Sequence, residues 1–385
     1  MRFKKLTTVC LLTTLASPLA RGVDLSDYNG RMFNGALVYS DEWANMSVTQ
    51  APTGLYRFTM GQNPAIEKKY SRMALDFMSG ANCRGKFYGV RPITIFGSLL
   101  SVGYDCIDTQ SYSLVAQQYI EENVNWEAVG CGMTYDLASG QIYAVEYNDD
   151  LTGLYWSTFS TDPMGYNQIT KWKSKFAIVA LGNTPDGRFY AISTAGDLYE
   201  IDRKRGTTTL VGSTGVNVQQ STQSLVWDNA NGNFLWTACT TSGSGIYAVD
   251  TQTGSATLIQ SLDHGEQIVG AWFEDNTALP KAPAAVTDLK VSYVSPGSSS
   301  ATVSATLPSK TFDGSPVSGE VYYELWLDGE IAVEGNAAGG SPITYDCSLA
   351  EGNHYVYLMV KNSAGFAPAA YVYNLPATTL RSLLL

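Results

Sequence analysis

Residues 183–202 read NTPDGRFYAISTAGDLYEID, and the features of this stretch recur between residues 31 and 275 of the 385-residue chain. Asp186 precedes a turn at Gly187, an aromatic strand segment follows, and a second turn leads to the Leu198-Tyr199 pair. Apolar residues predominate on both sides of the second turn. Short apolar segments separated by turns that contain Asp and Gly are typical of strands joined in hairpins.

The same pattern returns about every 48 residues, which identifies a repeat before any other motif is considered. The tyrosine of the second strand pair recurs at intervals of 48, 51, 44 and 48 residues, at Tyr56, Tyr104, Tyr155, Tyr199 and Tyr247. A glycine-led strand precedes four of these tyrosines and begins at Gly85, Gly140, Gly187 and Gly232.

Each repeat is predicted to form four short strands. In the third repeat they are expected at 128–135, 141–147, 153–158 and 166–171. A single sheet of this kind cannot bury both of its faces. Radial packing of several copies around a channel buries them, which predicts an all-β fold of the β-propeller type.

The two ends of the repeat array indicate how the ring closes. The first repeat has only three predicted strands, at 33–40, 54–60 and 65–70, and the strand it lacks resembles 267–273. A blade built from both ends would remove the open edge. The sequence therefore predicts a five-bladed propeller over 31–275, and a sixth blade is possible only if strands are hidden in 121–127.

The repeats resemble those of secreted β-propellers of the quinoprotein, NHL or YVTN kind. The resemblance covers residues 31–275. The repeats contain neither the G-H…W-D signature nor a repeated Asp-box of the sialidase type. It implies the fold and leaves the activity open.

A second domain is predicted after a Pro/Ala linker at 276–285. About seven short strands between 286 and 377 predict a β-sandwich, and few contacts are expected across the linker. The segments AVTDLKV, YYELWLDGE and EGNHYVYLMVKNSAGFAPAA resemble a fibronectin type III domain. This resemblance implies spacing and adhesion, as in bacterial surface proteins that combine propellers with such modules. Residues 378–385 are predicted to form a tail. One hypothesis left open is that the chain is part of a longer surface protein.

The N-terminus has the three parts of a Sec-type signal peptide, predicted over 1–20. Arg2, Lys4 and Lys5 precede an apolar run that is too short to span a bilayer. Residues 1–22 contain four basic residues and no acidic ones, so their removal would change the net charge from −11 to −15. We therefore expect a secreted or cell-surface protein without a transmembrane segment, and a nucleic-acid partner is disfavoured by this charge.

Catalytic and metal-binding motifs are scarce. The chain has two histidines, His264 and His354, and no C-x-x-C pair, so no metal site and no cofactor is predicted. Five cysteines would remain after signal cleavage, and unpaired thiols in strands are favoured, with Cys83 and Cys106 the first pair to test for a bridge.

Four aspartates, Asp136, Asp186, Asp228 and Asp275, follow the first strand of successive repeats. A carboxylate pair among them would suit a glycosidase. Because they recur with the repeat, the favoured interpretation is that each accepts hydrogen bonds within its own turn.

The predicted ligand-binding residues are two tryptophans and their acidic neighbours, together with the propeller's histidine: Trp227, Trp272, Asp228, Asp275 and His264. Indole rings at a propeller mouth can stack on sugars or clasp apolar side chains. The leading hypothesis is a non-catalytic surface protein whose propeller recognises a glycan or protein, with the sandwich as spacer. The alternatives are a carbohydrate-active enzyme and a structural part of a larger surface assembly.

Overall fold

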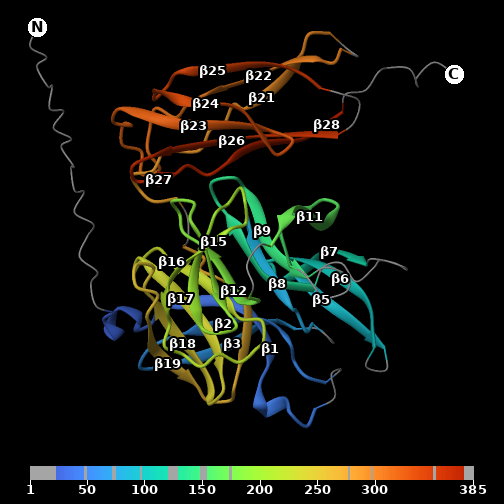
Figure 1. Ribbon diagram of the computed structural model, residues 1–385, viewed down its shortest axis with the longest axis vertical. Coiled ribbons are helices and arrows are strands. Elements are labelled where there is room, and N and C mark those ends of the chain that lie inside the picture. The colour runs from blue at the N-terminus through green and yellow to red at the C-terminus, as the bar shows by residue number, and fades with distance from the viewer. Residues whose placement is uncertain are drawn as a thin grey trace, which may run out of the picture.

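The computed structural model describes residues 23–46, 50–71, 75–95, 98–119, 129–147, 154–172, 176–275, 278–295, 298–349 and 353–376. In these ranges the chain is all-β, apart from two short 3-10 turns at Leu25–Tyr28 and Asp41–Trp43. A group of four-stranded sheets forms the larger part of the molecule, and the C-terminal strands form a second part above it (Figure 1). The predicted signal peptide and tail lie outside the described residues.

Five of the sheets have four antiparallel strands each. The first contains β20 (Gln267–Trp272), β1 (Met32–Tyr39), β2 (Gly54–Thr59) and β3 (Ala65–Ser71), in that order. The second contains β4 (Ser79–Cys83), β5 (Lys86–Ile95), β6 (Ser98–Asp108) and β7 (Ser113–Tyr119). The third contains β8 (Val129–Asp136), β9 (Gln141–Tyr147), β10 (Leu154–Thr161) and β11 (Met164–Lys171). The fourth contains β12 (Ile178–Asn183), β13 (Phe189–Ser193), β14 (Asp197–Ile201) and β15 (Thr208–Ser213). The fifth contains β16 (Ser224–Asp228), β17 (Asn233–Thr240), β18 (Gly243–Val249) and β19 (Ala256–Leu262).

The cores of this region lie between neighbouring sheets. One apolar cluster joins the second sheet to the third through residues such as Tyr104 and Phe159, and others join the third to the fourth and the fourth to the fifth. Two further clusters connect the first sheet to the fifth and to the second. Sheets that pack face to face in this cyclic order form a β-propeller arrangement, as the repeat predicts.

The first strands of the sheets approach one another closely around the centre. β4 contacts β8, β8 contacts β12, β12 contacts β16, β16 contacts β20, and β20 contacts β4. Glycines allow this approach: a Cβ on Gly132 would lie 2.8 Å from the Leu181 Cβ atom, and one on Gly182 would lie 2.6 Å from the Leu225 carbonyl oxygen. A side chain at either position would force the strands apart.

The predicted strand at 267–273 is confirmed as the missing strand of the first repeat. β20 pairs antiparallel with β1, with Ala36 opposite Val269 and Leu37 opposite Ile268. Ile268 and Val269 are fully buried, so the last strand of the array completes both a sheet and two inter-sheet cores. The segment 121–127, where strands of a sixth blade would have to lie, is outside the described residues.

The C-terminal part has two sheets. One contains β21 (Lys290–Tyr293), β22 (Ser300–Thr306) and β25 (Pro342–Ser348), and the other contains β24 (Glu330–Ala338), β23 (Glu320–Leu327), β26 (Asn353–Asn362), β27 (Gly365–Phe366) and β28 (Ala370–Pro376). Along β26, Val356, Leu358 and Val360 point into the core shared by the two sheets. The alternate residues Tyr357 and Met359 belong to a separate cluster with Ala138 of the propeller. The five-stranded sheet is therefore buried on both faces, as its near-continuous apolar sequence allows.

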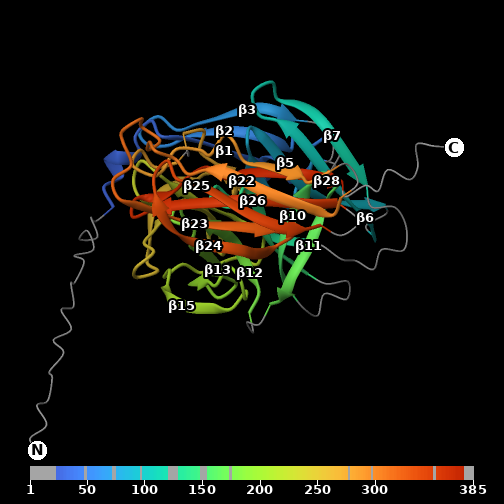
Figure 2. The ribbon, with the colours of Figure 1, turned by 90° about the horizontal axis from the view of Figure 1, so that it is seen from above.

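The expectation of few contacts across the linker is wrong. Arg203, in the turn between β14 and β15, reaches Glu324 on β23 with an Nη2–Oε2 distance of 3.3 Å, and it lies 3.9 Å from Asp136 Oδ2. Its guanidinium carbon also lies 5.4 Å from the ring centroid of Trp326. Seen from above, the C-terminal sheets lie over the propeller (Figure 2). The reason is the second apolar face of β23 and β26, which the propeller covers.

This interface predicts how an isolated C-terminal fragment behaves. Residues 281–375 contain a complete core between their two sheets, so we expect the fragment to fold alone. It would expose Trp326, Tyr357 and Phe366, which the propeller buries. The fragment should therefore self-associate, as measured by analytical ultracentrifugation. A variant with Tyr357→Ser and Phe366→Ser should be more monomeric, whereas an unfolded fragment by NMR would contradict the prediction.

Cys83, Cys106, Cys239 and Cys347 have free thiols, so Cys83 and Cys106 are not bridged. Both pack as small apolar side chains between the second and third sheets. Within the described ranges there is no helix with the length and apolar character needed to cross a membrane.

Candidate ligand-binding site

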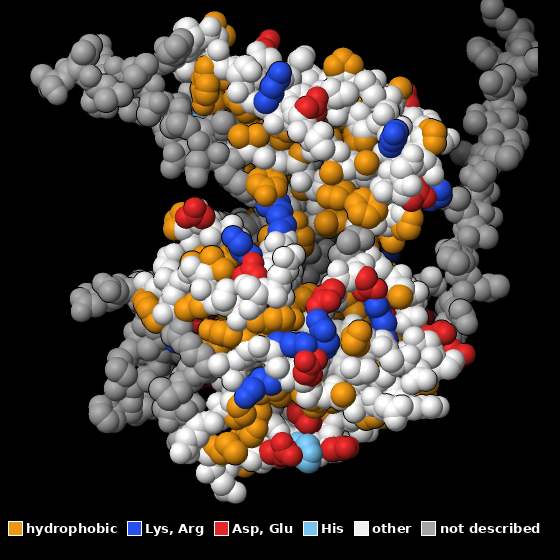
Figure 3. Space-filling model, turned by 180° about the vertical axis from the view of Figure 1, so that it is seen from behind, with side chains coloured by type: hydrophobic (Ala, Val, Ile, Leu, Met, Phe, Trp, Pro, Cys, Tyr) orange, Lys and Arg blue, Asp and Glu red, His pale blue; other side chains and the backbone are white. Residues whose placement is uncertain are grey.

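A cavity of about 810 Å³ lies where the first strands of the sheets reach their hairpins. All five first strands contribute to its wall, and the C-terminal part contributes Phe312, Pro368 and Ala369. The molecule is hollowed where its upper and lower parts meet on the face shown in Figure 3. The site is thus a propeller mouth that the C-terminal part of the chain partly covers.

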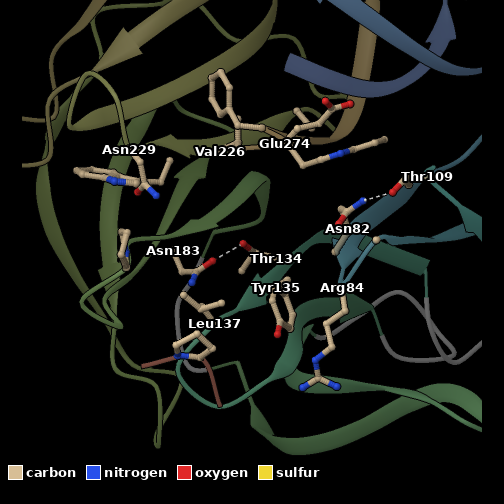
Figure 4. A pocket seen from close by; sticks show the side chains of 18 of the residues that line it. Asn82, Arg84, Thr109, Thr134, Tyr135, Leu137, Asn183, Val226, Asn229 and Glu274 are labelled. Atoms are coloured by element: carbon tan, nitrogen blue, oxygen red, sulfur yellow. Dashed lines mark hydrogen bonds between the residues drawn. The ribbon is translucent and has the colours of Figure 1, made fainter. Parts of the chain in front are cut away.

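Polar side chains near the ends of the first strands form one side of the pocket. Thr134 on β8 donates a hydrogen bond to Asn183 Oδ1 on β12 at 2.6 Å, and Asn82 on β4 donates to Thr109 Oγ1 at 3.3 Å. Figure 4 shows both bonds, with Asn229 on the side of the pocket away from Asn82 and Thr109. Amides and hydroxyls in a cavity can exchange hydrogen bonds with a ligand's hydroxyl groups.

The two predicted tryptophans both line the pocket, but they are held differently. Trp227 is half-buried and packs edge-on against Phe234, with ring centroids 5.2 Å apart. Trp272 is 8% exposed and packs against Phe87 at 5.5 Å within an inter-sheet core. Trp227 therefore has more surface to offer a ligand.

The predicted acidic residues Asp228 and Asp275 come together, but around a cation that the sequence reasoning did not use. Arg31 Nη2 lies 2.6 Å from Asp228 Oδ1, and Arg31 Nη1 lies 2.6 Å from Asp275 Oδ2. Its guanidinium also lies 4.2 Å from the Phe273 ring centroid. The hydrogen bonds from Arg31 lower the pKa of Asp275. Through Arg31, Asp228 links the N-terminal segment to the fifth sheet, and Asp275 links it to the residues after β20. Neither carboxylate is among the lining residues of the pocket.

Hydrogen bonds within the turn are present at Asp136 and Asp228, as the favoured interpretation of the repeated aspartates predicts, whereas Asp275 pairs with Arg31. Asp136 accepts from the amides of Ala138 and Ser139, and Asp228 accepts from the amide of Ala230. Both carboxyl groups are buried. Burial raises the pKa of Asp136, which the hydrogen bonds and Arg203 oppose.

His264 lies away from the pocket. It precedes β20, whereas the pocket is at the C-terminal end of that strand. Its Nε2 atom is 3.3 Å from Glu42 Oε1, and its side chain is half exposed. His264 is thus placed in an acidic loop and is not brought together with the tryptophans.

Among the described residues that line the pocket, Glu274 is the single carboxylate, and Arg57 and Arg84 are the two cations. Arg57 Nη2 lies 2.5 Å from Glu274 Oε1, so these two charges offset each other. The sequence reasoning missed Asn82, Asn183 and Arg84. The signal that could have found them is their position at the hairpin end of a first strand, rather than their residue type.

No protein-family model matches the chain, and no curated protein matches it by sequence. Similar solved structures include an exo-β-1,3-galactanase from Phanerochaete chrysosporium, with 9% identity over 88% of this chain and 95% of that one, at a TM-score of 0.40. TolB from Acinetobacter baumannii has 12% identity over 89% of this chain and 67% of that one, at a TM-score of 0.37. The WD40 β-propeller domain of Doa1 has 9% identity over 57% and 82%, at a TM-score of 0.32. At these TM-scores the propeller assignment depends on the chain's own sheets and cores.

Proposed function

We propose that this chain is a secreted or cell-surface binding protein that recognises a glycan at the propeller mouth without catalysis. The observation that carries the proposal is the 810 Å³ pocket, whose wall combines an accessible indole with several amides and hydroxyls. Its volume lies in the range of small-ligand sites, about 300 to 1,000 Å³. Aromatic rings stack on the apolar faces of sugars, and the amides supply hydrogen bonds to their hydroxyls.

The proposal includes the finer architecture. The five sheets are the blades of a closed five-bladed propeller, which the cyclic contacts of their first strands and the pairing of β20 with β1 support. The two C-terminal sheets are a fibronectin type III-like sandwich. Because this domain supplies part of the pocket wall, it positions the ligand in addition to acting as a spacer.

The charges of the pocket favour binding over hydrolysis. Glycoside hydrolysis usually needs two carboxyl groups about 5 to 9.5 Å apart on either side of the scissile bond. The described lining residues supply one, Glu274, and Arg57 engages it. Asp228 and Asp275 are held by Arg31 instead.

The test is glycan-array screening followed by calorimetry with Trp227→Ala. We expect affinity for the best array ligand to fall by about tenfold or more, because a centrally placed aromatic side chain is commonly a binding hot spot. Trp43→Ala is the matched control, since Trp43 is also half-buried and is absent from the pocket wall. An equal loss in both variants, or turnover of the ligand by the wild type, would overturn the proposal.

A further inference from the structure

The net charge of the chain and the local charge of the pocket have opposite signs. The chain carries −11 overall, which by itself disfavours an anionic ligand. The described lining residues carry two arginines and one glutamate, and only Arg57 is paired with that glutamate. Charges beyond about 8 to 10 Å are largely screened at physiological salt, so the pocket's own charges act most strongly on a bound ligand.

Arg84 stands at a backbone position that arginine rarely occupies. It lies between β4 and β5 with φ of 54°, and Gly85 follows with φ of 76°. Successive positive φ values belong to the tight hairpin turn that favours Asn and Gly. A long side chain in this conformation is unusual, and such positions often mark functional sites. Arg84 lines the pocket, and Figure 4 shows its guanidinium at the end of the side chain that lies away from Asn82 and Glu274.

The guanidinium of Arg84 is fixed by groups that carry no formal negative charge. Its Nη2 atom donates to the Gly140 carbonyl oxygen at 3.2 Å, and its central carbon lies 3.6 Å from the Tyr371 ring centroid. The ion pairs found among the described residues do not include it. A guanidinium has five N–H donors in a fixed planar arrangement. N–H groups of Arg84 therefore remain that can donate two parallel hydrogen bonds to a planar anion.

Arg84 also lines a second cavity of about 530 Å³, between the third sheet and the C-terminal part. The wall of this cavity has hydroxyl and amide groups, and it also includes the carboxylate of Asp162 and the imidazole of His354. Two cavities with polar walls therefore meet at Arg84. This arrangement suits a saccharide with a charged unit at the junction better than an apolar peptide.

We propose that Arg84 makes the pocket selective for an acidic saccharide, whose carboxylate it binds in a bidentate manner. This inference rests on the proposed function, because it assigns the class of glycan that the same pocket takes. The carboxylate of a uronic acid has the planar geometry that arginine matches and lysine does not.

The experiment measures dissociation constants for an oligogalacturonate and for its carboxyl-reduced, neutral counterpart, using the full chain. We expect the wild type to bind the acidic form about 10- to 100-fold more tightly, because hydrogen bonds between charged groups are the strong ones. Arg84→Gln should abolish this preference, because it should weaken binding of the acidic form far more than binding of the neutral form. Arg205→Gln removes the same charge from an exposed turn residue outside both cavities and should keep the preference.

The outcomes separate the inference from the proposed function. A wild type that binds neutral glycans equally well or better would overturn the role of Arg84 and leave glycan recognition intact. If Arg84→Gln weakens both ligands equally, Arg84 is only structural. Binding of an acidic tetrapeptide as tight as that of the oligogalacturonate would overturn the saccharide assignment. Absence of binding to every glycan would defeat the proposed function itself.

Discussion

A chain without β20 is expected to aggregate instead of folding to a stable monomer. β1 would lose its partner and present an unpaired edge that can pair with other chains. Ile268 and Val269 are fully buried, so the deletion also empties parts of two cores. Light scattering and size-exclusion chromatography measure the result. A monomer with an unchanged melting temperature would refute the closed-ring proposal.

A point variant tests the same strand without shortening the chain. Ile268→Asp places a carboxylate in an apolar core and should abolish cooperative thermal unfolding, because an unpaired buried charge costs several kcal/mol. Thr257→Asp introduces the same group on the exposed face of β19 and should change stability by less than about 0.5 kcal/mol.

Arg31→Ala should lower the free energy of unfolding by about 3 kcal/mol, measured by urea denaturation at neutral pH. The Asp228 side chain is fully buried, and Arg31 reaches it with two hydrogen bonds. The variant leaves that carboxylate without its cation. Its turn partners, Ala230 and Asn231, remain and limit the loss.

Asp275→Asn is the comparison for Arg31→Ala. The Asp275 side chain is 57% exposed, so water screens its pairing, and we expect a loss below about 1 kcal/mol. Because its pKa is lowered in the folded state, this small contribution is present at neutral pH and is lost as the pH falls through the folded-state pKa. Equal losses of stability in Arg31→Ala and Asp275→Asn would contradict the view that burial of the Asp228 carboxylate determines the effect of Arg31→Ala.

The strands of the propeller could be predicted well from the sequence because the repeat supplies several aligned examples of each strand. The predicted 141–147 strand coincides with β9, and the others of the third repeat differ by a few residues at their ends. The pairing of β20 with β1 could be predicted for the same reason: a repeat with three strands indicates where the fourth must come from.

The candidate site could be predicted only in part. Strand position predicted Trp227 and Trp272 near one end of the propeller, and both line the pocket. It could not show that Arg31, about 200 residues away in sequence, neutralises Asp228, because long-range charge pairing leaves no local pattern. Nor could it identify Arg84, whose relevance comes from its turn conformation and from the second domain's Tyr371.

The contact between the propeller and the C-terminal sheets could have been predicted from a local sequence pattern. The prediction of an independent spacer did not use that pattern. Tyr355 to Val360 is an unbroken apolar run, whereas a strand with one solvent-facing side alternates. The structure buries one set of these residues between the two sheets and places the other set against the propeller.

The pairing of β20 with β1 also determines when the first sheet can be completed during synthesis of the chain. β1 is made early, but its inner partner is not available until about 230 further residues have been synthesised. Since domains generally begin to fold as they emerge, the first sheet waits with an open edge while the later sheets form. The pairing of β20 with β1 is a long-range contact and is therefore expected to form slowly. We therefore expect the chain to be most prone to aggregation before β20 has been synthesised.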